Sequence, residues 1–243
     1  MIYFLVALFA TTIGAVSGIG GGLIIRPSLS LMGIGLGVAT FTSAACVFVM
    51  SFVTATTRRV WKTDVPFKHL VFLAIGAIVG AFAGAYTLIF LDSITVAILF
   101  IASMVINIIM LRLRETVQSR TVTNPALGLG VGFATGFLAG LFGIGGGLVQ
   151  MVALMYLYGS KPKDAVVQSL FIAMMSSGAA LIQYTINGFA DLSLLPYVIP
   201  GAILGGLIGG VIAKRMQDKT VTTLLYILMI VVIMSQIIYI ATH

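Results

Sequence analysis

The residues from Gly18 to Gly22 read Gly-Ile-Gly-Gly-Gly, and the same five letters return from Gly143 to Gly147, 125 positions later in a chain of 243. Each cluster interrupts an apolar stretch, where glycine is costly in a helix. A helix restarting after a cluster presents unpaired N–H groups and the positive end of its dipole, which suits a small anion. Tight turns and close packing without a ligand are the alternative. The candidate binding glycines are Gly18, Gly20, Gly21, Gly22, Gly143, Gly145, Gly146 and Gly147.

Arg26 follows the first cluster by one helical turn and carries the only side-chain charge between residues 1 and 57. An arginine inside a membrane is costly and usually serves a functional site, although near a helix end it can also reach the headgroups. The matching position of the second half holds Met151, with Gln150 beside it. The site is therefore predicted to take its charge from one half only.

Hydroxyl and amide side chains lie near the start of one long apolar segment in each half, 38–57 in the first and 165–186 in the second. Thr42 and Ser43 do so in the first half, and Gln168 and Ser169 in the second. Such groups donate hydrogen bonds to an oxyanion without carrying a charge. Hydrogen bonding between neighbouring helices is the competing role. The other polar residues in apolar stretches are expected to be structural. These are Asn107, Gln183 and Gln236.

The composition, 60% hydrophobic and 8% charged, is that of a membrane protein. A bilayer crossing needs about 20 apolar residues. We therefore expect two short segments around each glycine cluster to form a broken, re-entrant hairpin, followed by three transmembrane helices. Arms that cross at a steep tilt would make ten spans instead. The expected segments are 2–17, 23–33, 38–57, 69–91 and 94–111, then 126–142, 148–158, 165–186, 192–213 and 220–241.

The basic residues decide the expected topology, because cytoplasmic loops are rich in Lys and Arg. They gather in 58–68, 112–120, 161–163 and 214–219, so the charge bias inverts between the halves 1–120 and 121–243. The sequence thus predicts an all-α membrane protein of two inverted-topology repeats forming one integral membrane unit, with both termini outside. Inverted repeats are typical of alternating-access transporters.

Two local patterns add detail. Glycines recur at every fourth residue, which places them on one helix face and predicts close helix packing. Asn124 suits a helix N-cap and Pro125 the first helical position, so a helix is expected to begin there. The glycine rows are Gly76, Gly80 and Gly84, then Gly201, Gly205 and Gly209.

Several classes of function are disfavoured. All six carboxylates lie in loops or at segment ends, so coupling through a buried carboxylate is not expected and the membrane potential is the simplest driving force. No Walker loop, metal-binding His/Cys cluster or catalytic constellation occurs, so we expect no metal, no cofactor and no enzyme. The net charge of +7 sets orientation and does not indicate nucleic-acid binding. The sequence is silent on oligomeric state and permits a homodimer.

The duplicated glycine breaks, with the turn Gly159-Ser160-Lys161-Pro162-Lys163-Asp164-Ala165, resemble the TauE/SafE sulfite exporter family, also called the four-toluene-sulfonate uptake permease family. The resemblance covers essentially the whole chain. It implies a bacterial or archaeal inner-membrane transporter of small sulfur-containing anions, such as sulfite, thiosulfate, sulfonates or sulfoacetate. Its implied site is the glycine clusters with Thr42, Ser43, Gln168 and Ser169. Where members commonly read Ala-Thr-Ser, this chain has Phe41-Thr42-Ser43 and Val167-Gln168-Ser169.

The leading hypothesis is export of a small oxyanion, driven by the membrane potential, through alternating access around the two breaks. The alternatives are an anion channel or an ion-coupled uptake permease on the same scaffold.

Overall fold

The computed structural model describes residues 1–58, 66–113 and 124–242, and within these ranges the chain is helical throughout. The helices follow the predicted segments to within about three residues. Those of the first half are α1 (Ile2–Ser17), α2 (Gly22–Leu31), α3 (Leu36–Arg58), α4 (Phe67–Thr87) with the short 3-10 helix η2 (Leu88–Phe90), and α5 (Ser93–Leu113). Those of the second half are α6 (Pro125–Phe142), α7 (Gly147–Leu157), α8 (Pro162–Ile186), α9 (Leu195–Arg215) and α10 (Asp218–Thr242).

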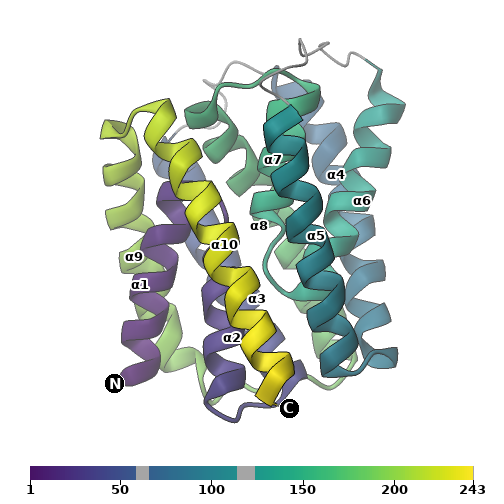
Figure 1. Ribbon diagram of the computed structural model, residues 1–243, viewed down its shortest axis with the longest axis vertical. Coiled ribbons are helices and arrows are strands. Elements are labelled where there is room, and N and C mark those ends of the chain that lie inside the picture. Colours follow the sequence, from purple (N-terminus) through teal and green to yellow (C-terminus); the bar gives the residue numbers. More distant parts are fainter. Residues whose placement is uncertain (59–65, 114–123, 243) are drawn as a thin grey trace.

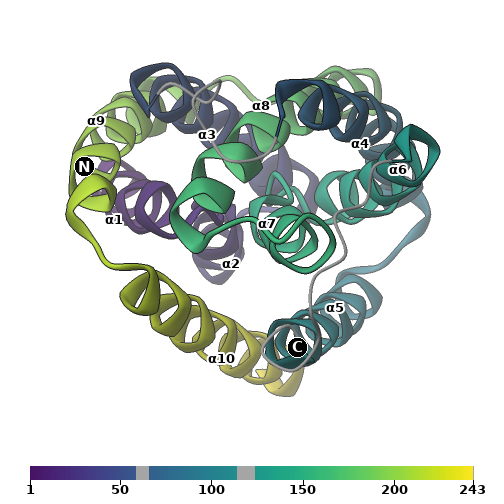
Figure 2. The same cartoon turned by 90° about the horizontal axis from the view of Figure 1, so that it is seen from above.

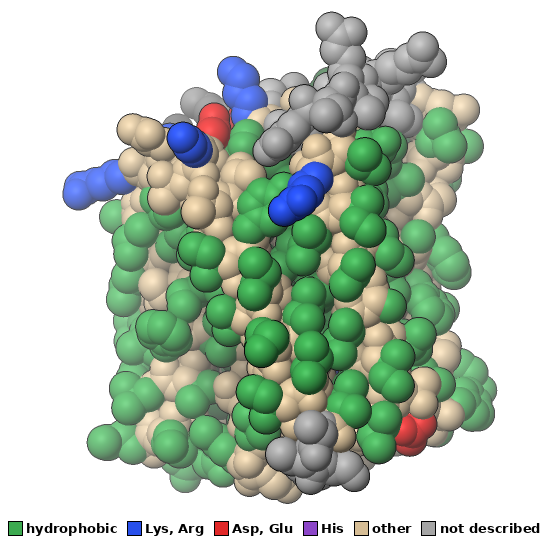
Figure 3. Space-filling model, in the orientation of Figure 1, with side chains coloured by type: hydrophobic (Ala, Val, Ile, Leu, Met, Phe, Trp, Pro, Cys, Tyr) green, Lys and Arg blue, Asp and Glu red, His purple; other side chains and the backbone are tan. Residues whose placement is uncertain are grey.

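The chain is a multi-pass membrane protein. Seven of the described helices are long and apolar enough to cross a bilayer, and they include α6, which the sequence analysis took as a hairpin arm. Large side chains such as Phe9, Phe52 and Phe90 are more than half exposed on the outer surface. Figure 3 shows hydrophobic side chains over the whole middle of the visible face. Such a surface is stable only against lipid.

Both termini lie at one end of the molecule (Figure 1), and the visible Lys and Arg side chains gather at the opposite end (Figure 3). The boundary between residues 120 and 121 and most of the two basic loops, 59–65 and 114–123, lie outside the described residues. The inverted repeat and the orientation in the membrane therefore remain predictions.

Helices of each half pack along helices of the other half. Helix α1 packs along α9, and α6 packs along α4, so that the first helix of each half lies against the fourth helix of the other. Helices α3 and α8 also pack together, whereas α5 and α10 lie side by side to one side of the remaining helices (Figure 2). The tertiary structure thus joins the two halves along most of their length.

Glycines allow the closest of these helix contacts. A Cβ added to Gly76, Gly80 or Gly84 of α4 would lie 2.0–2.2 Å from a backbone carbonyl oxygen of α6. In α9, a Cβ added to Gly201 or Gly209 would lie 2.4–2.7 Å from a carbonyl oxygen of α1. The predicted packing role of both glycine rows is confirmed, since no residue with a Cβ fits at these distances.

Candidate functional site

The two glycine clusters break their helices in the same way. In each, the first glycine ends the preceding helix in a left-handed conformation, and the fourth residue is the N-cap of the next helix. The new helices begin at Gly22 and Gly147, one residue earlier than the sequence analysis placed them. Left-handed backbone favours glycine because a Cβ would clash there. The positive φ angles occur at matching positions, Gly18, Gly20 and Gly21, then Gly143, Gly145 and Gly146.

The two breaks contact each other in the buried interior. A Cβ added to Gly22 would lie 2.7 Å from the Cα of Ile144, and one added to Gly147 would lie 2.7 Å from the carbonyl oxygen of Ile19. These contacts are reciprocal, because Ile19 and Ile144 occupy matching positions in the two clusters. The backbone of each break therefore packs directly on the other, and the glycines serve both the turns and this close approach.

The short helices α2 and α7 both begin at this contact, with 10 and 11 residues. At 1.5 Å per residue each extends about 15 Å, half the thickness of a bilayer core. Figure 1 shows them running from the middle of the molecule toward opposite ends. The N-cap residue of each is a glycine, Gly21 or Gly146, which has no side chain to cap the helix. Two positive helix ends thus meet near the centre of the molecule.

Arg26 lies in α2 and is 6% exposed. One of its terminal nitrogens donates to the carbonyl oxygen of Phe142, the last residue of α6, at 3.3 Å. A cation suits the C-terminal end of a helix dipole. The side chain therefore bridges α2 of one half to the break of the other. Exposure this low does not fit a guanidinium that has reached the headgroups.

Two serines brace the first break. The hydroxyl of Ser43 donates to the carbonyl oxygen of Gly22 at 3.3 Å, and that of Ser169 donates to the carbonyl oxygen of Gly18 at 3.1 Å. Thr42 is fully buried beside Ser43, and its hydroxyl oxygen has no hydrogen-bond partner among the described residues. The serines hold the turn in place, whereas the Thr42 hydroxyl contributes no hydrogen bond to it among the described residues.

The two glutamines hold different segments. The amide of Gln150 donates to Ser176 at 3.3 Å, and Ser176 donates to the carbonyl oxygen of Gly145 at 3.2 Å, so this chain braces the second break. The side-chain oxygen of Gln168 accepts from Ser160 at 2.8 Å, in the turn between α7 and α8. The structure thus joins Gln150 to the break and gives Gln168 a contact in the adjoining turn.

Some residues at the site were not predicted. Ser176 supports Gly145, and the hydroxyl of Tyr184 donates to the carbonyl oxygen of Gly140, just before the second break. Both lie in the apolar run of α8, and nothing in the sequence indicates which residue either side chain bonds to. By contrast, Asn107 and Gln183 bond within one helical turn, which agrees with their predicted structural role. The Asn107 oxygen is left without a partner in the described chain.

Comparison with known proteins identifies the family. The chain matches the family described as Sulfite exporter TauE/SafE over residues 3–235. The probable membrane transporter protein YunE of Bacillus subtilis (strain 168) is 30% identical over an alignment 260 residues long, which covers 96% of this chain and 95% of that protein. The probable membrane transporter protein MJ0441 of Methanocaldococcus jannaschii is 29% identical over 211 residues, 82% of this chain and 78% of that protein. A probable membrane transporter protein of Xylella fastidiosa (strain 9a5c) is 27% identical over 205 residues, 81% of this chain and 78% of the relative. The chain therefore belongs to the sulfite exporter TauE/SafE family of membrane transporters.

Proposed function

We propose that the protein exports a small sulfur-containing oxyanion, such as sulfite, thiosulfate, a sulfonate or sulfoacetate, across a bacterial or archaeal inner membrane. The observation that carries the proposal is Arg26, a cation 6% exposed in the interior, where it bonds to Phe142 just before the second break. A buried charge with only a carbonyl partner is costly, so an anionic ligand would relieve that cost. The family described as a sulfite exporter supports the same substrate class.

The binding element that we propose is the meeting point of the two breaks. The uncapped N-termini of α2 and α7 offer backbone donors and positive dipole ends to an oxyanion. The glycines of one break touch the other in this conformation. The anion would therefore enter when the two breaks separate.

Alternating access follows from the proposed inverted repeat. The reciprocal contacts between the breaks and the crossed packing of α1 on α9 and α6 on α4 support a two-fold relation between the halves. Rocking of one half against the other would expose the site first to one side and then to the other. With the termini outside, the Arg26 guanidinium would face the outer side of the membrane.

The membrane potential is the driving force that we propose. Moving one negative charge outward across a membrane with an inside-negative potential of about 100 mV releases roughly 2.3 kcal/mol, and a divalent anion releases about twice that. The sequence places no carboxylate in the middle of an apolar segment that could couple transport to protons.

The test is sulfite flux in proteoliposomes under an imposed potential. We expect saturable flux that follows the potential and falls about 100-fold in Arg26→Gln. Glutamine keeps a donor for the Phe142 carbonyl but removes the charge, so folding should survive. Flux that never saturates would favour an anion channel, and flux that needs a cation gradient would favour an ion-coupled permease. A wild-type protein that moves none of sulfite, thiosulfate and sulfoacetate would contradict the proposal.

A further inference from the structure

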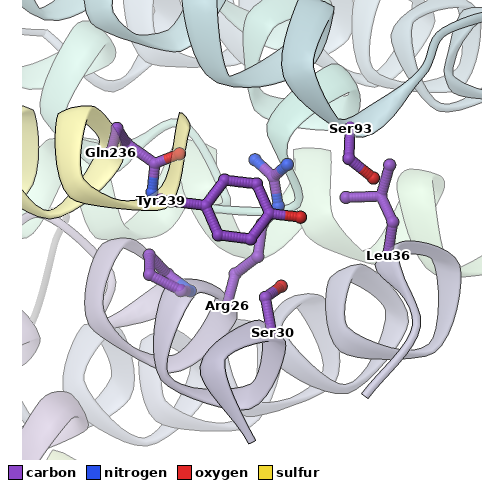
Figure 4. Close-up of a pocket in the computed structure, with 7 residues that line it drawn as sticks. Arg26, Ser30, Leu36, Ser93, Gln236 and Tyr239 are labelled. Carbon is purple, nitrogen blue, oxygen red and sulfur yellow. The ribbon is translucent and has the colours of Figure 1, made fainter. Parts of the chain in front are cut away.

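A second polar feature lies beside Arg26, on the side away from the two breaks. A pocket opens between α2, the start of α3, the start of α5 and the last turns of α10 (Figure 4). It lies toward the end of the molecule that carries both termini, since α10 ends and α5 begins there (Figure 1). Its polar lining residues are Arg26, Ser30, Ser93, Gln236 and Tyr239.

The lining is rich in hydrogen-bond donors. An arginine has five N–H groups, and the structure gives Arg26 one acceptor, the carbonyl oxygen of Phe142. Gln236 is also 6% exposed, and the spacing of three residues puts it on the same face of α10 as Tyr239. Figure 4 shows the Tyr239 ring in front of the Arg26 guanidinium, with Ser30 beside them. The pocket therefore combines a buried cation with amide and hydroxyl groups.

The carboxylate next to the lining residue Ser93 does not neutralise this cation. Asp92 precedes Ser93, but its oxygens accept from the backbone N–H groups of Ile94 and Thr95 at 3.1 Å and from the Thr95 hydroxyl at 2.5 Å. It is thus turned to cap α5, and no described carboxylate forms an ion pair with Arg26. Within the described residues, the positive charge of the pocket therefore has no carboxylate partner.

We propose that Ser30, Ser93, Gln236 and Tyr239 form, with Arg26, an outer subsite for the sulfonate or sulfite group of the substrate. A pyramidal group of three sulfur-bound oxygens accepts two N–H bonds from a guanidinium and leaves acceptor capacity for the amide and the hydroxyls. This inference rests on the proposed function and adds its second point of contact. The same chemistry fits inorganic sulfite and an organic sulfonate.

The subsite is closed in this conformation, because its interior has room for about one water molecule. Helix α10 supplies both Gln236 and Tyr239 and lies with α5 at one side of the bundle (Figure 2). Entry of the anion therefore requires the last turns of α10 to move away from α2. Gln236 and Tyr239 then act both as cover and as contacts.

The test measures binding separately from transport. Purified protein in detergent is titrated with sulfite and with methanesulfonate by calorimetry, for the wild type, Gln236→Leu and Tyr239→Phe. Leucine is the residue at the matching position of the first half, Leu111, and Phe removes only the hydroxyl. We expect about tenfold weaker binding in each variant. The matched control is Ser235→Ala, because Ser235 lies on α10 outside the pocket and bonds to its own helix at Val232.

Each outcome decides a different point. Weaker binding in both variants with an unchanged control supports the subsite, and binding of only one probe identifies the source of the sulfur group. Equal affinity in all variants, or no binding of either probe, overturns the subsite. In both of those cases the Arg26-dependent flux, which is measured separately, decides whether the proposed transport function is correct.

Discussion

Arg26 in α2 and Met151 in α7 occupy matching positions 125 residues apart, yet their surroundings differ completely. Around Arg26 lie Ser30 and Gln236, which line a polar pocket. The positions that match these two are Met155 and Leu111, and both are buried in the hydrophobic core together with Met151. The backbone breaks are alike, but the side chain at the matching position of the following helix lines a polar pocket in one half and is packed in the hydrophobic core in the other.

The difference indicates how the two proposed repeats would divide their tasks. The glycine turns need the same backbone in both halves, so they are retained letter for letter. If the substrate offsets the burial of Arg26, as we propose, a second buried cation would double the desolvation cost without a second substrate to offset it. One half therefore supplies the charge, and the other supplies packing.

Exchanging the residue types of Arg26 and Met151 is the strongest test of this difference between the two halves. Met151→Arg should destabilise the protein by about 4 kcal/mol or more, because it buries an unpaired charge in an apolar core. Arg26→Met should fold with a smaller loss and should abolish anion flux. Thermal unfolding in detergent measures both, with Met151→Leu as the volume-matched control. A stable Met151→Arg would mean that the second half also holds a wet cavity.

The glycine rows allow the two interlocked helix pairs to be compared. A Cβ at Gly76 meets a carbonyl oxygen of α6 at 2.2 Å, whereas one at the matching Gly201 meets a carbonyl oxygen of α1 at 2.7 Å. We expect Gly76→Ala to cost about 3 kcal/mol and Gly201→Ala about 1–2 kcal/mol through overpacking. Gly130→Ala in α6 is the control, because nothing lies within 4 Å of its added Cβ. Equal losses at Gly76 and Gly130 in unfolding experiments would refute the packing argument.

The breaks themselves should respond unequally to the same change. Alanine at Gly20 or Gly145 must adopt a positive φ, which costs about 1–2 kcal/mol. The added Cβ at Gly145 also lies 2.2 Å from a methyl of Val47, against 3.1 Å at Gly20. Gly145→Ala should therefore lose more stability and flux than Gly20→Ala, and Val47→Ala should restore part of the difference. If Val47→Ala restores nothing, backbone strain alone explains the loss.

The smallest effects are expected at the neighbouring hydroxyls. Ser43→Ala removes a bond to the Gly22 carbonyl and should cost about 1 kcal/mol. Thr42→Val replaces a buried hydroxyl that has no partner in the described chain, so stability should be unchanged or rise by up to about 1 kcal/mol. Unfolding and flux are measured on both. A drop in flux without loss of stability would place the Thr42 hydroxyl in the substrate path.

The sequence was sufficient to predict the helices and the two breaks. The lengths of the apolar runs and the paired glycines carry that information locally, and the break at Gly18 needs no knowledge of distant residues. The end of α4 was harder to predict from the sequence, because the apolar run continues beyond Thr87 through η2.

The residues that contact the site residues could not be predicted from the sequence in the same way. Arg26 bonds to Phe142, 116 residues away, through a backbone carbonyl that every residue possesses. Gln236 stood out as polar in an apolar run, but Tyr239 beside it is an ordinary membrane-edge residue by type. Only the packing of α10 over α2 brings the two to Arg26.

The packing of α1 on α9 also has a consequence for biogenesis. Helix α1 ends at Ser17 and its partner begins at Leu195. At about 5–20 residues per second, a ribosome needs roughly 10–40 seconds to make the intervening chain. The first helix must therefore wait in the nascent protein without its tertiary partner until most of the chain has been synthesised. Truncated chains that stop before α9 should accordingly be prone to proteolysis, however well their individual helices insert.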